Sequence, residues 1–527
     1  MLSIRRFFPI ALFTVGAAAA SAATCERLAA LALPNTAITA AQTVPAGPFT
    51  PPGGRAGENP RPFCRVAGVI RPSGDSDIRF EVWMPAEGWN GKLLGVGNGG
   101  FAGSIDFNSL GIAVRAGYAA AATDTGHQAG TVDAAWALNH PEKAIDFGYR
   151  AIHETVQKAK AVIAAFFGGQ PRHSYFSSCS NGGRQGLMEA QRYPEDYDGI
   201  VAGAPASFWT HLVTVGVWDA LALSGDAYIP AAKVPAIEAA AVAACDAADG
   251  VTDGLIGDPA RCRFDPSTML CKGPDSAACL TQPQVAALKK LYSGPRNAKG
   301  ESTFPGHMPG GESGPAGWPL WVTGPAPARS LGYGFGSQFF ANMVFANPAW
   351  DYRAFQVDRD TKAGDDKMAR ILNATDPDLS RFRQRGGKLI LYHGWSDAAI
   401  SPLNTIDYFN SVEKKLGARQ TDSFVRLFMA PGLQHCTEGP GPNSFGQAAA
   451  PQGDPGDNIN RAVERWVEDG VAPDRIVATK FRSGSNASSG VARTRPLCPY
   501  PRVAHYKGAG SIDDDANFVC AAPAANR

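Results

Sequence analysis

The chain has 527 residues, enough for several domains or for one large enzyme with an insertion. Its 49 Lys and Arg residues nearly balance 48 Asp and Glu residues, so no excess positive charge is available to bind nucleic acid or an acidic membrane surface. Hydrophobic residues make up 44% of the chain and charged residues 18%, which indicates a large buried core and excludes a fibrous or disordered protein.

The N-terminus has the pattern of an export signal. Residues 1–22 comprise a positive start (Arg5, Arg6), an apolar run and the small-residue site Ala20-Ser21-Ala22. The alternative is a membrane anchor, but Pro9 interrupts the run, which is shorter than the ~20 residues of a spanning helix. No later segment is expected to cross a membrane. We predict a secreted or periplasmic protein.

All ten cysteines follow the predicted cleavage site. An even number in an exported chain favours disulfides over free thiols, and no Cys-x-x-Cys zinc spacing is present. Short sequence separations favour the pairs Cys245–Cys262, Cys271–Cys279 and Cys498–Cys520. This leaves Cys25, Cys64, Cys179 and Cys436 to pair among themselves.

Strand-like and helix-like segments alternate along the chain. Strands are predicted at residues 78–84, 92–96, 118–123, 173–177 and 199–204, with helices at 141–167 and 181–193. The alternation lapses after residue 206 and resumes with strands at 388–392, 425–429 and 475–481 and a helix at 458–469. We predict an α/β fold with a parallel, doubly wound sheet in a main domain (23–206 and 377–527) and an inserted domain (207–376).

Ser180 lies between a predicted strand and a predicted helix, where a sharp turn exposes a nucleophile at the helix N-terminus. Gly182 and Gly183 permit such a turn, but Ser178 replaces the first glycine of Gly-x-Ser-x-Gly, so a turn without chemistry is the alternative. Asp397 and His435 each follow a later predicted strand. The order Ser, Asp, His is that of α/β-hydrolases and predicts His435 as the base, oriented by Asp397.

Two cysteines directly flank these candidates. Cys179 precedes Ser180 and Cys436 follows His435, so a bridge between them would hold the serine beside the imidazole. The alternative is that each cysteine pairs elsewhere. His393 is a rival base, but it precedes the predicted acid and is interpreted as structural.

A glycine-rich loop, Gly97-Asn98-Gly99-Gly100, follows the second predicted strand. The N–H of Gly99 or Gly100, with that of Asn181, is expected to form the oxyanion hole. Phosphate binding is the weaker interpretation of this loop, because no Gly-Lys-Ser/Thr motif follows it.

Asp246, Asp249 and Asp253 lie close together in a turn that contains glycines. Carboxylate and carbonyl oxygens suit Ca²⁺, although the spacing is not that of an EF-hand and aspartates also favour turns without metal. A Cys245–Cys262 bridge would preorganise the loop and favours a structural calcium site in the inserted domain.

These motifs resemble the tannase/feruloyl esterase family, which includes bacterial mono(2-hydroxyethyl) terephthalate hydrolase. The resemblance covers nearly the whole mature chain and is carried by Cys179-Ser180-x-Gly-Gly-Arg-Gln, Gly-Asn-Gly-Gly-Phe101-Ala-Gly, His393-Gly-Trp-Ser-Asp397 and His435-Cys436. It implies an α/β-hydrolase core with a lid, the disulfides Cys179–Cys436 and Cys25–Cys64, and Ca²⁺ held by Asp246, Asp249, Asp253 and the carbonyls of Val251 and Leu255.

The resemblance also implies an exported serine carboxylesterase that acts on small aromatic esters of feruloyl, galloyl or terephthalate-monoester type through an acyl-enzyme. Rival interpretations are a silent ligand-binding relative and a peptidase or acyltransferase with the same triad. A terephthalate enzyme is expected to hold a free carboxylate with a lid arginine, and residues 331–345 contain none. Phe335, Phe339, Phe340 and Trp318 are candidates to pack on an aromatic acid, although lid aromatics more often belong to the core.

Overall fold

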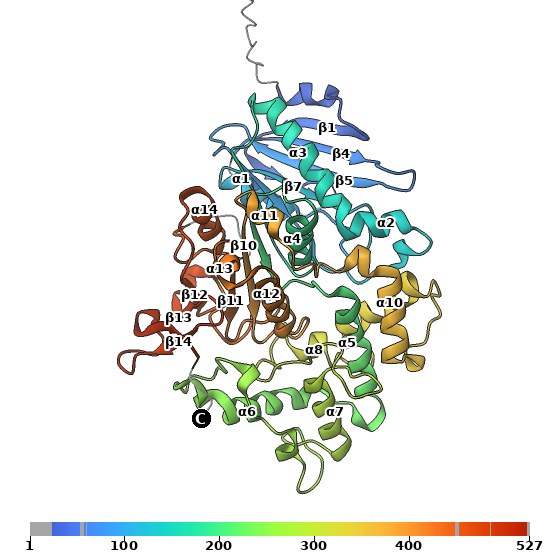
Figure 1. Ribbon diagram of the computed structural model, residues 1–527, viewed down its shortest axis with the longest axis vertical. Helices are drawn as coiled ribbons and strands as arrows, with labels where there is room; N and C mark the ends of the chain where they lie inside the picture. Colours follow the sequence, from blue (N-terminus) through green and yellow to red (C-terminus); the bar gives the residue numbers. More distant parts are fainter. Residues whose placement is uncertain (1–23, 53–56, 60, 448–452, 485, 524–527) are drawn as a thin grey trace, which may run out of the picture.

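A computed structural model describes residues 24–52, 57–59, 61–447, 453–484 and 486–523. The predicted signal peptide at 1–22 lies outside the described residues. The chain folds around one large sheet, with a group of helices at one end (Figure 1).

The central sheet has nine strands in the order β1-β4-β5-β7-β6-β8-β9-β10-β11. Pairing is antiparallel from β1 to β7 and parallel from β7 to β11, as expected for a largely doubly wound sheet. The strands are β1 (Thr36–Val44), β4 (Phe63–Ile70), β5 (Ile78–Pro85), β6 (Lys92–Val96), β7 (Ala119–Thr123), β8 (His173–Cys179), β9 (Gly199–Gly203), β10 (Lys388–Gly394) and β11 (Val425–Ala430).

Helices cover both faces of this sheet, and each face has its own hydrophobic core. One core contains residues of α3 (Ala151–Phe167), α4 (Asn181–Arg192) and α12 (Pro402–Leu416). The other contains residues of α1 (Phe107–Arg115) and α14 (Ile459–Asp469). The α/β-hydrolase fold is therefore confirmed, and the carboxyl ends of β8, β10 and β11 face the same edge of the sheet.

The segment between β9 and β10 contributes no strand to the central sheet within the described residues. Its main helices group at the end of the molecule beyond the strands (Figure 1). They have separate hydrophobic clusters, one of which includes Phe101 and Phe147 of the catalytic core. These helices are α5 (Trp209–Ala222), α6 (Val234–Cys245), α7 (Gln282–Ser293), α9 (Leu331–Gln338) and α10 (Val357–Leu372).

The C-terminal strands form small sheets beside the central one. The strand predicted at 475–481 exists as β12 (Ile476–Phe481), but it pairs with β13 (Val491–Leu497) outside the central sheet. A further hairpin joins β14 (Val503–Tyr506) and β15 (Phe518–Ala521).

The expectation that no later segment is long and apolar enough to cross a membrane was wrong for one stretch, if that stretch is counted as a single helix. The helical stretch Gly225–Asp249 is long and apolar enough to cross one. The chain there is divided into 3-10 turns and the twelve-residue helix α6, with Pro230 before that helix and Pro235 in its first turn. A helix of that length rises about 18 Å, short of the ~30 Å hydrocarbon core.

Five disulfides join all ten cysteines. The three short pairs predicted from sequence are confirmed, and so are the two long-range pairs implied by the resemblance. Disulfides persist in oxidising compartments, which agrees with a protein that functions outside the cytoplasm.

Candidate active site

Ser180 occupies a sharp turn between β8 and α4. Its backbone has φ 67° and ψ −126°, a conformation that non-glycine residues rarely adopt. The turn needs small neighbours: a Cβ added to Gly182 would lie 1.9 Å from Ser178 Oγ, and one added to Gly183 would lie 2.3 Å from the Gly203 carbonyl oxygen. Ser178 is therefore compatible with the turn even though it departs from the usual glycine pattern.

The structure brings the three predicted triad residues together. His435 Nε2 lies 2.9 Å from Ser180 Oγ, and His435 Nδ1 lies 2.8 Å from Asp397 Oδ2. Asp397 Oδ1 accepts hydrogen bonds from the N–H groups of Ala399 and Ile400. This hydrogen-bond chain allows the imidazole to accept a proton from the serine while the carboxylate fixes its tautomer.

Asp397 is buried but remains ionised. Burial alone would raise the pKa of Asp397, but His435 and His393 with their hydrogen bonds hold it below its ordinary value. A carboxylate that stays charged in a dry environment stabilises an imidazolium strongly.

His393 contacts the same carboxylate oxygen of Asp397 as His435 does and is fully buried. Its Nε2 lies 3.1 Å from both Asp397 Oδ2 and the Ile400 carbonyl oxygen, so this nitrogen donates. Its Nδ1 then accepts from Thr405 Oγ1 at 2.7 Å. Both ring nitrogens are engaged, which supports the interpretation of His393 as structural.

A disulfide joins the residues next to the predicted nucleophile and the predicted base. Cys179 and Cys436 are bonded with a Cα–Cα distance of 6.0 Å, although they are 257 residues apart in sequence. The bridge connects the end of β8 to the loop after β11. It restricts the relative movement of Ser180 and His435.

The predicted oxyanion-hole residues Gly99, Gly100 and Asn181 line the same cavity as Ser180. The glycine loop is fixed to α4 by a pair of amides that sequence reasoning missed. Gln185 Oε1 accepts the N–H of Asn98, and Gln185 Nε2 donates to Asn98 Oδ1. Gln185 stands in the Gly-Gly-Arg-Gln motif, but nothing in the sequence pairs it with the distant loop.

Arg184 is a second buried residue of the same motif. Its Nε donates to Asn181 Oδ1 at 2.8 Å, and its other nitrogens donate to carbonyls of Phe147, Gly148 and Leu372. The guanidinium lies 4.9 Å from the Phe147 ring centroid. Burial lowers the pKa of Arg184 to about 9, so the side chain remains charged near pH 7.

A cavity of about 530 Å³ opens beside Ser180 and His435 between the core and the lid. Its walls are mostly apolar, as is usual for small-molecule sites. Of the four lid aromatics proposed from sequence, Phe335 lines the cavity, whereas Phe339, Phe340 and Trp318 are buried in the core. Trp209 and Trp321, which the sequence did not single out, also line it, and Trp321 packs edge-on against His435 at 5.1 Å.

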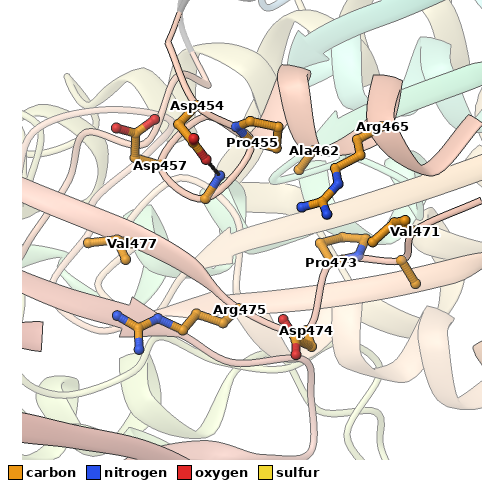
Figure 2. A pocket seen from close by; sticks show the side chains of 12 residues that line it. Asp454, Pro455, Asp457, Ala462, Arg465, Val471, Pro473, Asp474, Arg475 and Val477 are labelled. Carbon is orange, nitrogen blue, oxygen red and sulfur yellow. Dashed lines mark hydrogen bonds between the residues drawn. The ribbon is translucent and has the colours of Figure 1, made fainter. Parts of the chain in front are cut away.

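A second concavity of about 610 Å³ lies between the loop at 454–457, α14 and the start of β12 (Figure 2). Its charged residues are aspartates and arginines, among them Asp454, Arg465 and Arg475. The described lining contains no Ser, Cys or His, so this concavity offers no nucleophile and no imidazole base.

Two groups of possible metal ligands converge within 4.8 Å among the described residues, and neither includes the aspartate loop. In one, Cys271 and Cys279 are joined in a disulfide and offer no thiolate. The other comprises His153, Glu189 and Asp196, where burial and the neighbouring Asp196 raise the pKa of Glu189 well above its ordinary value.

The chain matches the family model described as tannase and feruloyl esterase over residues 64–521. It is 44% identical to an uncharacterized esterase of Xanthomonas campestris, with 95% of this chain and 92% of that protein covered. It is 35% identical to mono(2-hydroxyethyl) terephthalate hydrolase of Piscinibacter sakaiensis, with 87% and 85% covered.

Solved structures agree with this relationship. Feruloyl esterase B from Aspergillus oryzae matches with a TM-score of 0.87 and 30% identity over 94% of this chain and 99% of that one. The match spans both the sheet and the lid. The chain therefore belongs to the tannase and feruloyl esterase family and is a carboxylic ester hydrolase.

Proposed function

We propose that the protein is an exported serine esterase that hydrolyses esters of aromatic acids through an acyl-enzyme. The observation that carries this proposal is the hydrogen-bond chain from Ser180 through His435 to Asp397 beside an apolar cavity with aromatic walls. The five disulfides support export, and the N-terminal pattern supports a cleaved signal.

In the proposed acylation, Ser180 Oγ attacks the ester carbonyl carbon while His435 Nε2 takes the hydroxyl proton. The negative oxygen of the tetrahedral intermediate accepts hydrogen bonds from the N–H of Asn181 and of Gly99 or Gly100. His435 then returns the proton to the leaving alcohol, and the acyl group stays on Ser180. In deacylation, water repeats these steps and releases the acid.

The active-site test is a Ser180→Ala substitution assayed with methyl ferulate, methyl gallate and a nitrophenyl ester. Loss of the nucleophile should lower kcat about 10⁴-fold or more, because only binding and the oxyanion donors remain. A fluorophosphonate should add covalently to the wild-type protein but not to the variant. Unchanged turnover in the variant would exclude Ser180 as the nucleophile. Assays on a matched ester and amide separate the two classes, because an esterase should hydrolyse the ester far faster and a peptidase should also hydrolyse the amide.

We also propose that the aspartate loop of the lid holds a structural Ca²⁺. The donor set fits in kind, because carboxylate and carbonyl oxygens are the ligands that Ca²⁺ prefers, and Asp253 and Asp246 lie close enough to Asp249 that burial and their charges raise its pKa to about 6. Asp246 accepts the N–H groups of Asp253 and Gly254, which preorganises the turn. When bound, the ion would receive the carboxylates of these three aspartates and the carbonyls of Val251 and Leu255.

A further inference from the structure

Arg184 is a buried cation that has no acidic partner in the described chain. Its side chain is fully buried, and the acceptors of its four hydrogen bonds are neutral oxygens, one from an amide side chain and three from backbone carbonyls. Burial and the like charge of Arg192 lower its pKa to about 9, so it stays charged near pH 7. An ion removed from water without a counter-ion is costly, and its presence needs an explanation.

The guanidinium contacts the cavity wall at the predicted oxyanion hole. Its Nε donates to Asn181 Oδ1 at 2.8 Å, and its central carbon lies 5.2 Å from the centroid of the Trp209 ring. Asn181 and Trp209 both line the cavity, and Asn181 follows Ser180 directly. One layer of side chains therefore separates the charge of Arg184 from the space beside Ser180.

A positive charge at this place is unfavourable in the resting protein. Arg184 is the fourth residue of α4, and the N-terminus of that helix already carries a partial positive charge. Both positive charges become favourable when a negative charge forms beside them. The tetrahedral intermediate of the proposed mechanism supplies such a charge, on the oxygen that accepts the Asn181 N–H.

We propose that Arg184 is a positioning residue that holds Asn181 at the oxyanion hole and whose charge stabilises the negative oxygen of the tetrahedral intermediate. The inference rests on the proposed function, which places that oxygen beside the Asn181 N–H. The described lining of the cavity contains no Lys or Arg, so no cation in the wall itself supplies this stabilisation. A charge that is fixed in a buried place before the reaction acts strongly, because little water screens it and no reorganisation is needed.

The alternative is that Arg184 is a purely structural clamp. Its other three hydrogen bonds connect α4 to the carbonyls of Phe147 and Gly148, before α3, and of Leu372, at the end of α10. A clamp would contribute to stability, but it would not distinguish a neutral ligand of the cavity from an anionic one.

The test compares two inhibitors that share a phenyl ring. Phenylboronic acid reacts with Ser180: a bond forms between Oγ and boron, the hydroxyl proton passes to His435, and the adduct is a tetrahedral anion. Benzamide binds without reacting and stays neutral. A charge that acts on the oxyanion should therefore favour the first inhibitor and not the second.

Arg184→Gln removes the charge but keeps a side chain that can donate hydrogen bonds. It should lower kcat on a nitrophenyl ester about tenfold or more with little change in KM, because the bound ester is neutral and only the intermediate is charged. The Ki of phenylboronic acid should rise by a similar factor, and the Ki of benzamide should not change. Equal changes for both inhibitors, or an unchanged kcat in the folded variant, would overturn the proposal.

Asn181→Asp covers the case in which Arg184→Gln does not fold. The new carboxylate has the shape of the amide, keeps the backbone N–H and gives the guanidinium an acidic partner. We expect the Ki of phenylboronic acid to rise about tenfold or more with no fall in Tm, because the added charge cancels that of Arg184. A clamp would only be strengthened by the charged hydrogen bond, so an unchanged Ki would contradict the assignment.

Arg65 offers a matched control. Its guanidinium is also buried, but it is paired with Glu81, and neither residue lines the cavity. Arg65→Gln should lower the Tm and leave kcat per folded molecule and both inhibition constants unchanged. Failure of the proposed function gives a different result, because phenylboronic acid would then bind Ser180→Ala as tightly as the wild type and a fluorophosphonate would not label Ser180.

Discussion

Ser180 shows how a single residue is held in a conformation it would not adopt alone. A non-glycine residue at positive φ outside the ordinary regions costs roughly 1–3 kcal/mol, so the surroundings must enforce it. Its N–H donates to the Gly203 carbonyl, and its own carbonyl accepts from Arg184 and Ala206. Ser180 is thereby fixed by β9 and α4 as well as by the strand that precedes it.

Asp397→Asn should lower kcat about 10⁴-fold while leaving the fold intact. An asparagine keeps an oxygen that can accept the N–H groups of Ala399 and Ile400, but it has no charge to stabilise the His435 imidazolium. The expected loss is measured as kcat on a nitrophenyl ester, with circular dichroism to confirm folding. The pKa of Asp397 is held below its ordinary value, so the wild-type carboxylate should stay charged as the pH falls through that value. Protonation of Asp397 should therefore cause no loss of kcat near the ordinary pKa of an aspartate.

His435→Asn and His393→Gln separate the two histidines beside that carboxylate. The first should be as damaging as Ser180→Ala, because it removes the base itself. The second should reduce kcat per folded molecule far less, because the hydrogen bonds of His393 go to Asp397 and Thr405 and not to Ser180. Equal losses would assign His393 a direct part in proton transfer.

The predicted triad residues could be found because each follows a predicted strand, a pattern that local sequence displays. The residues that shape the cavity were not. Asp219 and His307 are 88 positions apart, and Asn98 and Gln185 are 87 apart, so their pairing depends on how distant elements pack. Single-sequence patterns contain no information on such contacts.

At the scale of elements, the strands that surround the site lie where the sequence predicted strands, and β6 has the predicted bounds 92–96. The strands β1 and β4 were missed. Almost every residue of β4 is buried because it lies between two other strands, so it lacks alternation, and β1 is a half-exposed edge strand rich in small residues. The apolar composition of helix α6 reflects packing inside the lid.

Removing the bridge with Cys179→Ser and Cys436→Ser should cause a large loss of kcat but only a small fall in Tm. Ser180 and His435 follow strands of one sheet, which keeps the fold, but the loop after β11 would no longer be fixed against β8. Stopped-flow acylation and thermal unfolding of the same sample measure the two effects. The control is Cys271→Ser with Cys279→Ser, a bridge remote from the cavity that should leave kcat unchanged. A fully active Cys179/Cys436 variant would show that the bridge is dispensable for catalysis.

For the whole molecule, the aspartate loop connects the lid to the C-terminal strands. Arg495 Nη2 donates to Asp253 Oδ2 at 2.6 Å, and Arg493 donates to the Asp253 carbonyl at 3.1 Å. Both arginines belong to β13, outside the lid. An ordered aspartate loop therefore holds the lid against the C-terminal strands, in addition to stabilising its own turn.

Chelation with EDTA should lower the Tm of the wild type, and added Ca²⁺ should restore it. A ligand at one hundred times its Kd stabilises the native state by about 2.7 kcal/mol, which is several degrees at most for a protein of this size. Scanning calorimetry with and without chelator measures the shift. Asp249→Asn should abolish the response, whereas Asp265→Asn, an exposed lid aspartate, should retain it. A wild-type Tm that changes with neither EDTA nor added Ca²⁺ would exclude the calcium site.

The bond between Cys179 and Cys436 closes a covalent ring that contains the whole segment between β9 and β10. A protease that cuts an exposed turn within this ring would place Ser180 and His435 on different fragments that remain tethered at their reacting ends. Nicked enzyme should migrate as one species until a reductant releases two. A single cut in the lid would therefore leave Ser180 and His435 joined through this disulfide.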